Sequence, residues 1–200
     1  MYDAYSRMEI LLGQKGVNRL STAKIAVFGL GGAGSYTVEA LARCGVGSLT
    51  LVDHEAITVT DINRQLYALQ PTIGHKKVQI AKERVHNIDE DILVHTYETY
   101  YNEDTMGLFD LKAYDYIVDA MDTVSSKILL IEQAQKYQVP VISCLDMGNK
   151  LNPSSLEIMD ISRVAADPAV KKMRAELRRK GVRRLKVLCS REHSRRGFEF

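Results

Sequence analysis

The chain has 200 residues, a formal net charge of +2 and a hydrophobic content of 46%, which is an ordinary composition for a globular protein. This length suits one sizeable α/β domain and is too short for a cofactor domain together with a full substrate domain. No apolar run approaches the roughly 18 residues of a membrane span, and the N-terminus lacks the basic-then-apolar order of a secretion signal. We therefore expect a cytoplasmic protein with no membrane partner.

The first half of the chain predicts a βαβ unit behind two short helices at 5–12 and 15–21. Residues 24–28 form a compact apolar run, which predicts a buried strand. A glycine-rich turn and a helix over 35–43 follow it. The next strand, 48–53, ends in an acid, and the whole unit has the usual length of about 30 residues.

The alternation of strands and helices continues to the C-terminus. Further elements are predicted at 76–87 (helix), 92–97 and 114–120 (strands), 124–137 (helix), 139–144 and 156–161 (strands), 167–180 (helix) and 182–188 (strand). Such alternation predicts a mostly parallel sheet with helices on both faces, a Rossmann-like three-layer α/β fold. We treat residues 1–200 as one domain with three parts: N-terminal helices (1–22), a Rossmann-like core (23–150) and a basic C-terminal segment (151–200).

The glycine turn predicts a nucleotide site. Gly29, Gly31 and Gly34 match GxGxxG between a strand and a helix, and Gly32 adds a fourth glycine. Glycines allow a sharp turn and a close approach to phosphates, and the following helix N-terminus offers free N–H groups. Asp53 ends the second strand, where its carboxylate can accept from ribose hydroxyls. A tight structural turn is the alternative, and the same geometry also serves NAD.

Three side chains beyond the turn favour triphosphate chemistry over NAD. Arg64 and Lys77 can hold phosphate oxygens and stabilise the charge that develops as a phosphorus–oxygen bond breaks. Asp122 follows another strand and can hold Mg²⁺ beside substrate phosphates. Each has a structural alternative: Arg64 as a surface ion-pair partner, Lys77 as a solvated helix residue, and Asp122 as the N-cap of helix 124–137.

The ordered motifs resemble those of the adenylating enzymes related to the ubiquitin-activating enzyme and the bacterial activators of sulfur-carrier proteins. The matching stretches are Gly-Leu-Gly-Gly-Ala-Gly (29–34), Asp-Ile-Asn-Arg-Gln (61–65), Ile-Gly-His-Lys-Lys-Val (73–78) and Asp-Ala-Met-Asp-Thr (119–123). They cover about residues 5–150.

The resemblance implies ATP at the glycine loop, with Asn63 among the nucleotide contacts. It implies ribose contact at Asp53, phosphate contacts from Arg64 and Lys77, and Mg²⁺ at Asp122. It also implies a homodimer in which Arg7 reaches into the partner's site.

Within that superfamily the chain is most similar to the tRNA threonylcarbamoyladenosine dehydratase branch, through stretches such as 40–47, 122–127 and 148–153. The implied partner is a modified tRNA; the alternative is a ubiquitin-like sulfur-carrier protein activated at its C-terminus. Cys44, Cys144 and Cys189 form no CxxC pair, which gives a structural zinc site no support and fits the dehydratase branch.

Two features depart from that branch. Asp61 stands where many relatives have Asn, so it either weakens ATP binding through its extra charge or contributes to metal binding. Residues 192–200 do not resemble the continuation of those relatives, so we expect a shortened C-terminal segment.

The charge of the chain is unevenly distributed. Residues 171–200 hold 12 Lys and Arg against 3 Asp and Glu, whereas residues 1–170 hold 15 against 22. A local excess of that size favours contact with a polyanion such as RNA, and a solvated helix face is the alternative.

Overall fold

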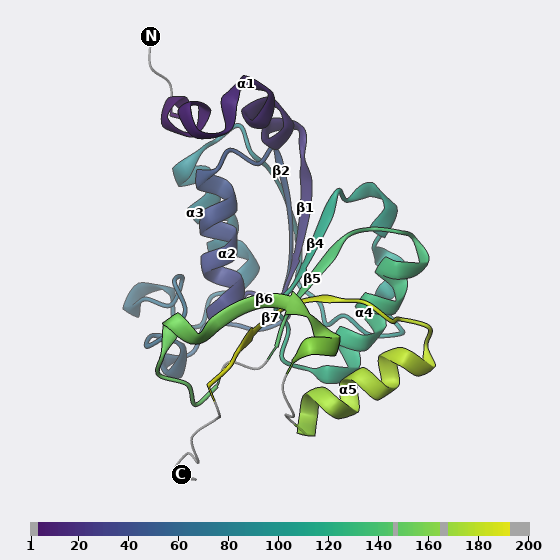
Figure 1. Ribbon diagram of the computed structural model, residues 1–200. Coiled ribbons are helices and arrows are strands. Elements are labelled where there is room, and N and C mark those ends of the chain that lie inside the picture. Colours follow the sequence, from purple (N-terminus) through teal and green to yellow (C-terminus); the bar gives the residue numbers. More distant parts are fainter. Residues whose placement is uncertain (1–3, 146–147, 165–167, 193–200) are drawn as a thin grey trace.

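The computed structural model describes residues 4–145, 148–164 and 168–192 (Figure 1). The five α-helices within these ranges are α1 (Ser6–Thr22), α2 (Gly32–Arg43), α3 (Lys77–Ile88), α4 (Val124–Lys136) and α5 (Pro168–Arg179). The strands are β1 (Lys24–Phe28), β2 (Ser48–Val52), β3 (Leu93–Tyr97), β4 (Tyr116–Asp119), β5 (Val141–Cys144), β6 (Leu156–Asp160) and β7 (Lys186–Ser190).

All seven strands join one sheet in the order β3-β2-β1-β4-β5-β7-β6. Every neighbouring pair is parallel except β6 and β7, which run antiparallel. The chain order reverses between β1 and β4, and at such a switch point the carboxyl ends of the strands leave a crevice for a ligand. The predicted mostly parallel Rossmann-like sheet is therefore confirmed.

Helices cover the sheet from both sides, with α2 and α3 on one face and α4 and α5 on the other (Figure 1). On the first side, β1 and β2 contribute Val27 and Leu49 to a cluster that also contains Val38 of α2 and Val85 of α3. The second side holds two clusters, one around Phe28 and Leu130 and one that joins α4 to α5. This packing leaves the loops at the carboxyl ends of the strands free to form a site.

Two predicted elements differ most from the structure, whereas most of the others shift by one to three residues at an end. The two N-terminal helices appear as one element, α1, broken at Gly13, whose φ of 69° interrupts the helical backbone. The last strand begins at Lys186 rather than at 182, because Val182 and Leu185 are buried at a spacing of three instead of alternating. Alternation starts only with exposed Lys186 followed by buried Val187.

No helix within the described ranges is long and apolar enough to cross a membrane.

Candidate active site

A cleft of about 1200 Å³ opens at the carboxyl ends of the parallel strands. Its walls come from the glycine loop after β1, the segments after β2, β3, β4 and β5, and the first turn of α5. Seven of the residues predicted from the sequence line it: Gly29, Gly31, Gly32, Asp53, Arg64, Lys77 and Asp122. The structure thus brings together residues that lie up to 93 positions apart in the sequence.

The glycines of the loop divide into two groups by what a side chain would meet. At Gly29 the backbone has a φ of 89°, and a Cβ would lie 2.6 Å from the carbonyl oxygen of Ala120. At Gly34 a Cβ would lie 1.8 Å from the carbonyl oxygen of Gly29. At Gly31 and Gly32 the nearest protein atoms are 3.9 Å and 3.6 Å away. The first pair is required by the fold, whereas the second pair leaves open space that a phosphate can approach closely.

This division predicts opposite results for two alanine substitutions. We expect Gly34→Ala to lower the free energy of unfolding by about 4 kcal/mol or more, because the methyl group collides with backbone. Gly32→Ala is expected to change stability by less than about 1 kcal/mol, while raising the Kd for ATP at least about tenfold by filling the phosphate position. Thermal unfolding and ATP titration of both variants measure this; wild-type ATP affinity in Gly32→Ala would contradict phosphate binding at the loop.

Asp53 fixes the shape of the loop from the end of β2. Its Oδ2 accepts from the backbone N–H of Leu30 at 2.7 Å, and its Oδ1 accepts from that of Glu55 at 2.8 Å. Each carboxylate oxygen has a second lone pair, so both remain able to accept from a ribose hydroxyl. The predicted ribose ligand therefore also holds the phosphate loop in place.

Arg64 reaches the cleft from a short turn that Asp61 organises. Buried Asp61 accepts from the backbone N–H and the hydroxyl of Thr58, both at 2.9 Å, and from Nε2 of Gln65 at 2.8 Å. Burial opposes ionisation of Asp61, but the two hydrogen bonds from Thr58 and the nearby cations Lys77 and Arg64 outweigh it and lower its pKa. The guanidinium of Arg64 lies 3.3 Å from Asp61 and donates to the Thr60 carbonyl at 2.8 Å. Asp61 thus positions Arg64.

Lys77 is the first residue of α3 and is buried despite its charge. Its ammonium forms an ion pair with Glu55, and its backbone N–H donates to the carbonyl of the same residue at 3.1 Å. The interpretation of Lys77 as a solvated helix residue is therefore wrong. Because the Lys77 ammonium reaches the cleft, it can exchange its Glu55 partner for a phosphate oxygen when a nucleotide binds.

Asp122 is exposed at the mouth of the cleft, directly after β4. The N-cap of α4 is Thr123, so the alternative of Asp122 as the N-cap is wrong.

An aromatic pair lies beside Thr123. The Thr123 hydroxyl is hydrogen-bonded to the Tyr100 hydroxyl, and the centroids of the Tyr100 and His54 rings are 4.2 Å apart. The sequence reasoning missed this aromatic pair, which only the pairing of β2 with β3 brings together.

A buried ion pair whose lysine, Lys127, lines the cleft was not predicted from the sequence. The Lys127 ammonium donates to Asp119 Oδ2 at 3.0 Å and to the Cys144 carbonyl at 2.7 Å, and the Ser143 hydroxyl donates to the same carboxylate oxygen. Burial raises the pKa of Asp119, although Lys127 and Ser143 act in the opposite direction. The available signal was Lys127 itself, a charge on the same helical stripe as the apolar Leu130, Ile131 and Ala134.

Three of the predicted site residues lie outside the lining of the cleft. Gly34 supports the loop from behind, and the Asn63 side chain accepts from Arg64 at 3.4 Å. Arg7 is exposed on α1, which lies near the amino ends of the strands, away from the cleft (Figure 1). Of the cysteines, Cys144 lines the cleft, whereas Cys189 lies in β7, where burial raises its pKa.

The ThiF family model matches residues 5–150. A tRNA threonylcarbamoyladenosine dehydratase of Bacillus subtilis is 39% identical over 92% of this chain and 72% of its own length. The Escherichia coli protein of that name is 32% identical over 84% of this chain and 63% of its own length. The chain thus spans between three fifths and three quarters of these two relatives.

A crystal structure of the Escherichia coli tRNA N6-threonylcarbamoyladenosine dehydratase in complex with ATP superposes with a TM-score of 0.89. It is 29% identical and the alignment covers 94% of this chain and 81% of that one. The adenylyltransferase and sulfurtransferase MOCS3 of Culex quinquefasciatus is 33% identical over 70% of this chain but only 32% of its own length. By sequence and by structure, this chain belongs to the ThiF family.

Proposed function

We propose that the protein is an ATP-dependent tRNA threonylcarbamoyladenosine dehydratase. The observation that carries this proposal is the cleft, whose lining combines an open glycine loop, the cations Arg64 and Lys77 and the exposed carboxylate of Asp122. That set suits activation of a carboxylate at the α-phosphate of ATP. The similarity to dehydratases over 92% of the chain supports the tRNA substrate, and a tRNA-modifying enzyme would act in the cytoplasm.

The proposed reaction has two steps. The threonyl carboxylate of the modified nucleoside attacks the α-phosphorus of ATP, and pyrophosphate leaves. A nitrogen of the same substituent then attacks the acyl carbon, closes a ring and loses its proton, while AMP leaves with one carboxylate oxygen. The net change is loss of water from the substrate, driven by cleavage of ATP.

The residues of the chain mainly position groups and stabilise charge. Gly31 and Gly32 would admit the phosphates, Asp53 the ribose, and Arg64 with Lys77 the charge that moves onto pyrophosphate. The exposed carboxylate of Asp122 fits Mg²⁺, which binds proteins through one or two carboxylates together with substrate phosphates. When bound, Mg²⁺ would neutralise charge on the phosphates of ATP.

An AMP-release assay tests this function. The protein is incubated with ATP, Mg²⁺ and either threonylcarbamoyladenosine-containing tRNA or the same tRNA without that modification. We expect AMP only with the modified tRNA, because only it carries the carboxylate. The alternative is an adenylyltransferase for a ubiquitin-like sulfur-carrier protein, which the similarity to MOCS3 supports; AMP release with a carrier protein and not with modified tRNA would overturn the dehydratase.

We further propose a homodimer in which Arg7 of one copy completes the cleft of the other. Arg7 cannot line its own cleft, and two neighbours on α1, Ile10 and Leu11, are 82% and 79% exposed. Apolar side chains this exposed suit burial against a second copy.

Subunit mixing provides the test of this dimer. Arg7→Ala and Asp122→Asn are each expected to lose activity, whereas the mixture is expected to regain up to about a quarter of the wild-type rate. A mixed dimer has one cleft with both groups intact, and random assortment places half of all subunits in mixed dimers. An inactive mixture, with exchange shown by native mass spectrometry, would contradict completion of the site by the partner.

A further inference from the structure

Helix α5 separates its charged and apolar residues onto opposite faces. Met173 and Leu177 are buried against α4 and β7. Four cations, Lys171, Lys172, Arg178 and Arg179, are exposed, and at 100° per residue they fall on the outward side of the helix. The apolar face explains why the helix packs on the sheet, but packing does not explain the cations.

The cations of this region differ in whether the protein already uses them. Lys180 is paired with Glu132 at 2.6 Å, and Arg174 donates to the carbonyls of Ser162 and Val164. Lys186 donates to the Tyr116 hydroxyl at 3.3 Å, and the charge of Arg184 acts on Asp160. Among the described residues, no ion pair or hydrogen bond engages the side chains of five further cations, which we call the basic face: Lys171, Lys172, Arg178, Arg179 and Arg183. Glu176 is the single acidic residue of α5. The unpaired positive charge is therefore available to a polyanion.

The helix that carries most of the basic face begins at the cleft and runs away from it. Ala169, Val170 and Met173, from the first turns of α5, line the nucleotide cleft. From there the 12 residues of the helix run about 18 Å away from it. At the far end Arg183 borders a second hollow of about 750 Å³, together with Arg184 and Lys186.

We propose that the basic face binds the phosphate backbone of the RNA substrate and so delivers the modified nucleoside to the cleft at the start of α5. This inference rests on the proposed function, which supplies the RNA. Exposed Arg and Lys without carboxylate partners are the usual ligands of backbone phosphates, and such contacts fix position without reading sequence. A carrier protein would not need a row of unpaired cations leading to the site.

RNA binding across a salt series tests the proposal. The Kd for modified tRNA is measured by fluorescence anisotropy, without ATP, for Lys171→Ala/Lys172→Ala and for Arg178→Ala/Arg179→Ala. Each double variant is expected to bind about tenfold more weakly. Each is also expected to flatten the plot of log K against log salt by about 0.7 to 0.9 for every phosphate that it no longer binds.

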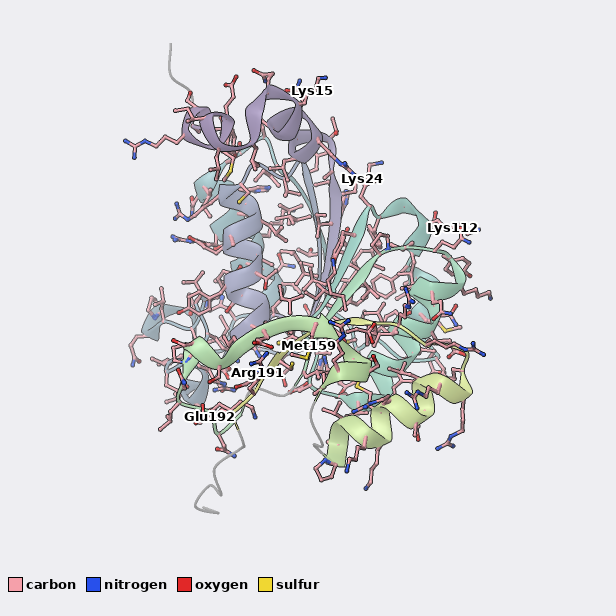
Figure 2. The ribbon with its side chains drawn as sticks, in the orientation of Figure 1. Lys15, Lys24, Lys112, Met159, Arg191 and Glu192 are labelled. Atoms are coloured by element: carbon pink, nitrogen blue, oxygen red, sulfur yellow. The ribbon has the colours of Figure 1, made fainter. Side chains whose placement is uncertain are left out.

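The matched control removes two exposed lysines at the other end of the molecule. Figure 2 shows Lys15 on α1 and Lys24 at the start of β1, far from α5. Lys15→Ala/Lys24→Ala is expected to leave both the Kd and the slope unchanged. Equal weakening in the control and in the α5 variants would overturn the proposal, because it would show only a general effect of net charge.

AMP release separates failure of this inference from failure of the proposed function. If the wild type releases AMP with modified tRNA and the α5 variants bind and react as the wild type does, the basic face is not the RNA site and the dehydratase assignment stands. If α5 variants lose AMP release with a carrier protein while RNA binding is unchanged, the inference is overturned. Weaker RNA binding with an unchanged Kd for ATP supports it.

Discussion

Replacing Lys127 by methionine is expected to lower the free energy of unfolding by about 3 to 5 kcal/mol, the usual cost of removing one partner of a buried ion pair. The substitution keeps the volume of the side chain but leaves the fully buried Asp119 carboxylate without its cation. Chemical denaturation at pH 8 measures the loss. A matched control is Lys136→Met, the same change at an exposed position of the same helix, which is expected to stay within about 0.5 kcal/mol.

The pH dependence of Lys127→Met identifies the cause. Burial already raises the pKa of Asp119, and loss of the ammonium raises it further. A group whose pKa is higher in the folded than in the unfolded protein takes up protons on folding, so stability falls as the pH rises from the unfolded to the folded pKa. The loss in free energy of unfolding caused by Lys127→Met should therefore be smaller at pH 5 than at pH 8. The double variant Asp119→Asn/Lys127→Met should recover part of that loss. A pH-independent deficit would mean that poorer packing, not the uncompensated carboxylate, is responsible.

Replacing Arg64 by alanine is expected to reduce the rate of AMP formation by about 10² to 10³, the usual loss when one group that stabilises a transition-state charge is removed. Stability should change by less than about 1 kcal/mol, because the Arg64 side chain is 56% exposed and the buried Asp61 keeps its hydrogen bonds to Thr58 and Gln65 when Arg64 is removed. The rate is measured at saturating ATP and modified tRNA, so that weaker binding does not contribute.

Arg43→Ala is the control for this prediction. Arg43 is 58% exposed and forms an i,i+4 pair with Glu39 on α2, so it resembles Arg64 in exposure and in having a nearby acidic partner, but it does not line the cleft. It should react at the wild-type rate. Equal losses in the two variants, or a wild-type rate in Arg64→Ala, would remove Arg64 from the charge-stabilising groups.

The parallel sheet and the position of the site could be predicted because they depend on local patterns. Strand 24–28 is predicted with its exact bounds since an apolar run stops at a glycine turn. Asp53 and Asp122 could be placed together because residues that follow parallel strands meet at one edge. The bounds of β7 could not be predicted, because burial of Val182 and Leu185 depends on α4 and α5 rather than on alternation.

The partner of each charged side chain in the site could not be predicted, because it depends on contacts between segments that are distant in the sequence. Nothing local to Lys77 indicates that Glu55 would neutralise it, because the two meet only when the segment after β2 lies against the start of α3. Asp61 looked like an extra charge near phosphates, whereas its hydrogen bonds to Thr58 and Gln65 turn it into the support of Arg64. The residue types were visible in the sequence, and their partners were not.

The inner side of the first turns of α5 forms part of the wall of the nucleotide cleft, while the outward side of the same helix carries most of the basic face. Occupancy of the cleft and occupancy of the basic face therefore act on one rigid element. Thermodynamic reciprocity then applies: by whatever factor bound RNA changes the affinity for ATP, bound ATP must change the affinity for RNA by the same factor. If the basic face binds RNA as proposed, α5 is the element through which the two ligands would be coupled, and the order in which they arrive would leave the stability of the ternary complex unchanged.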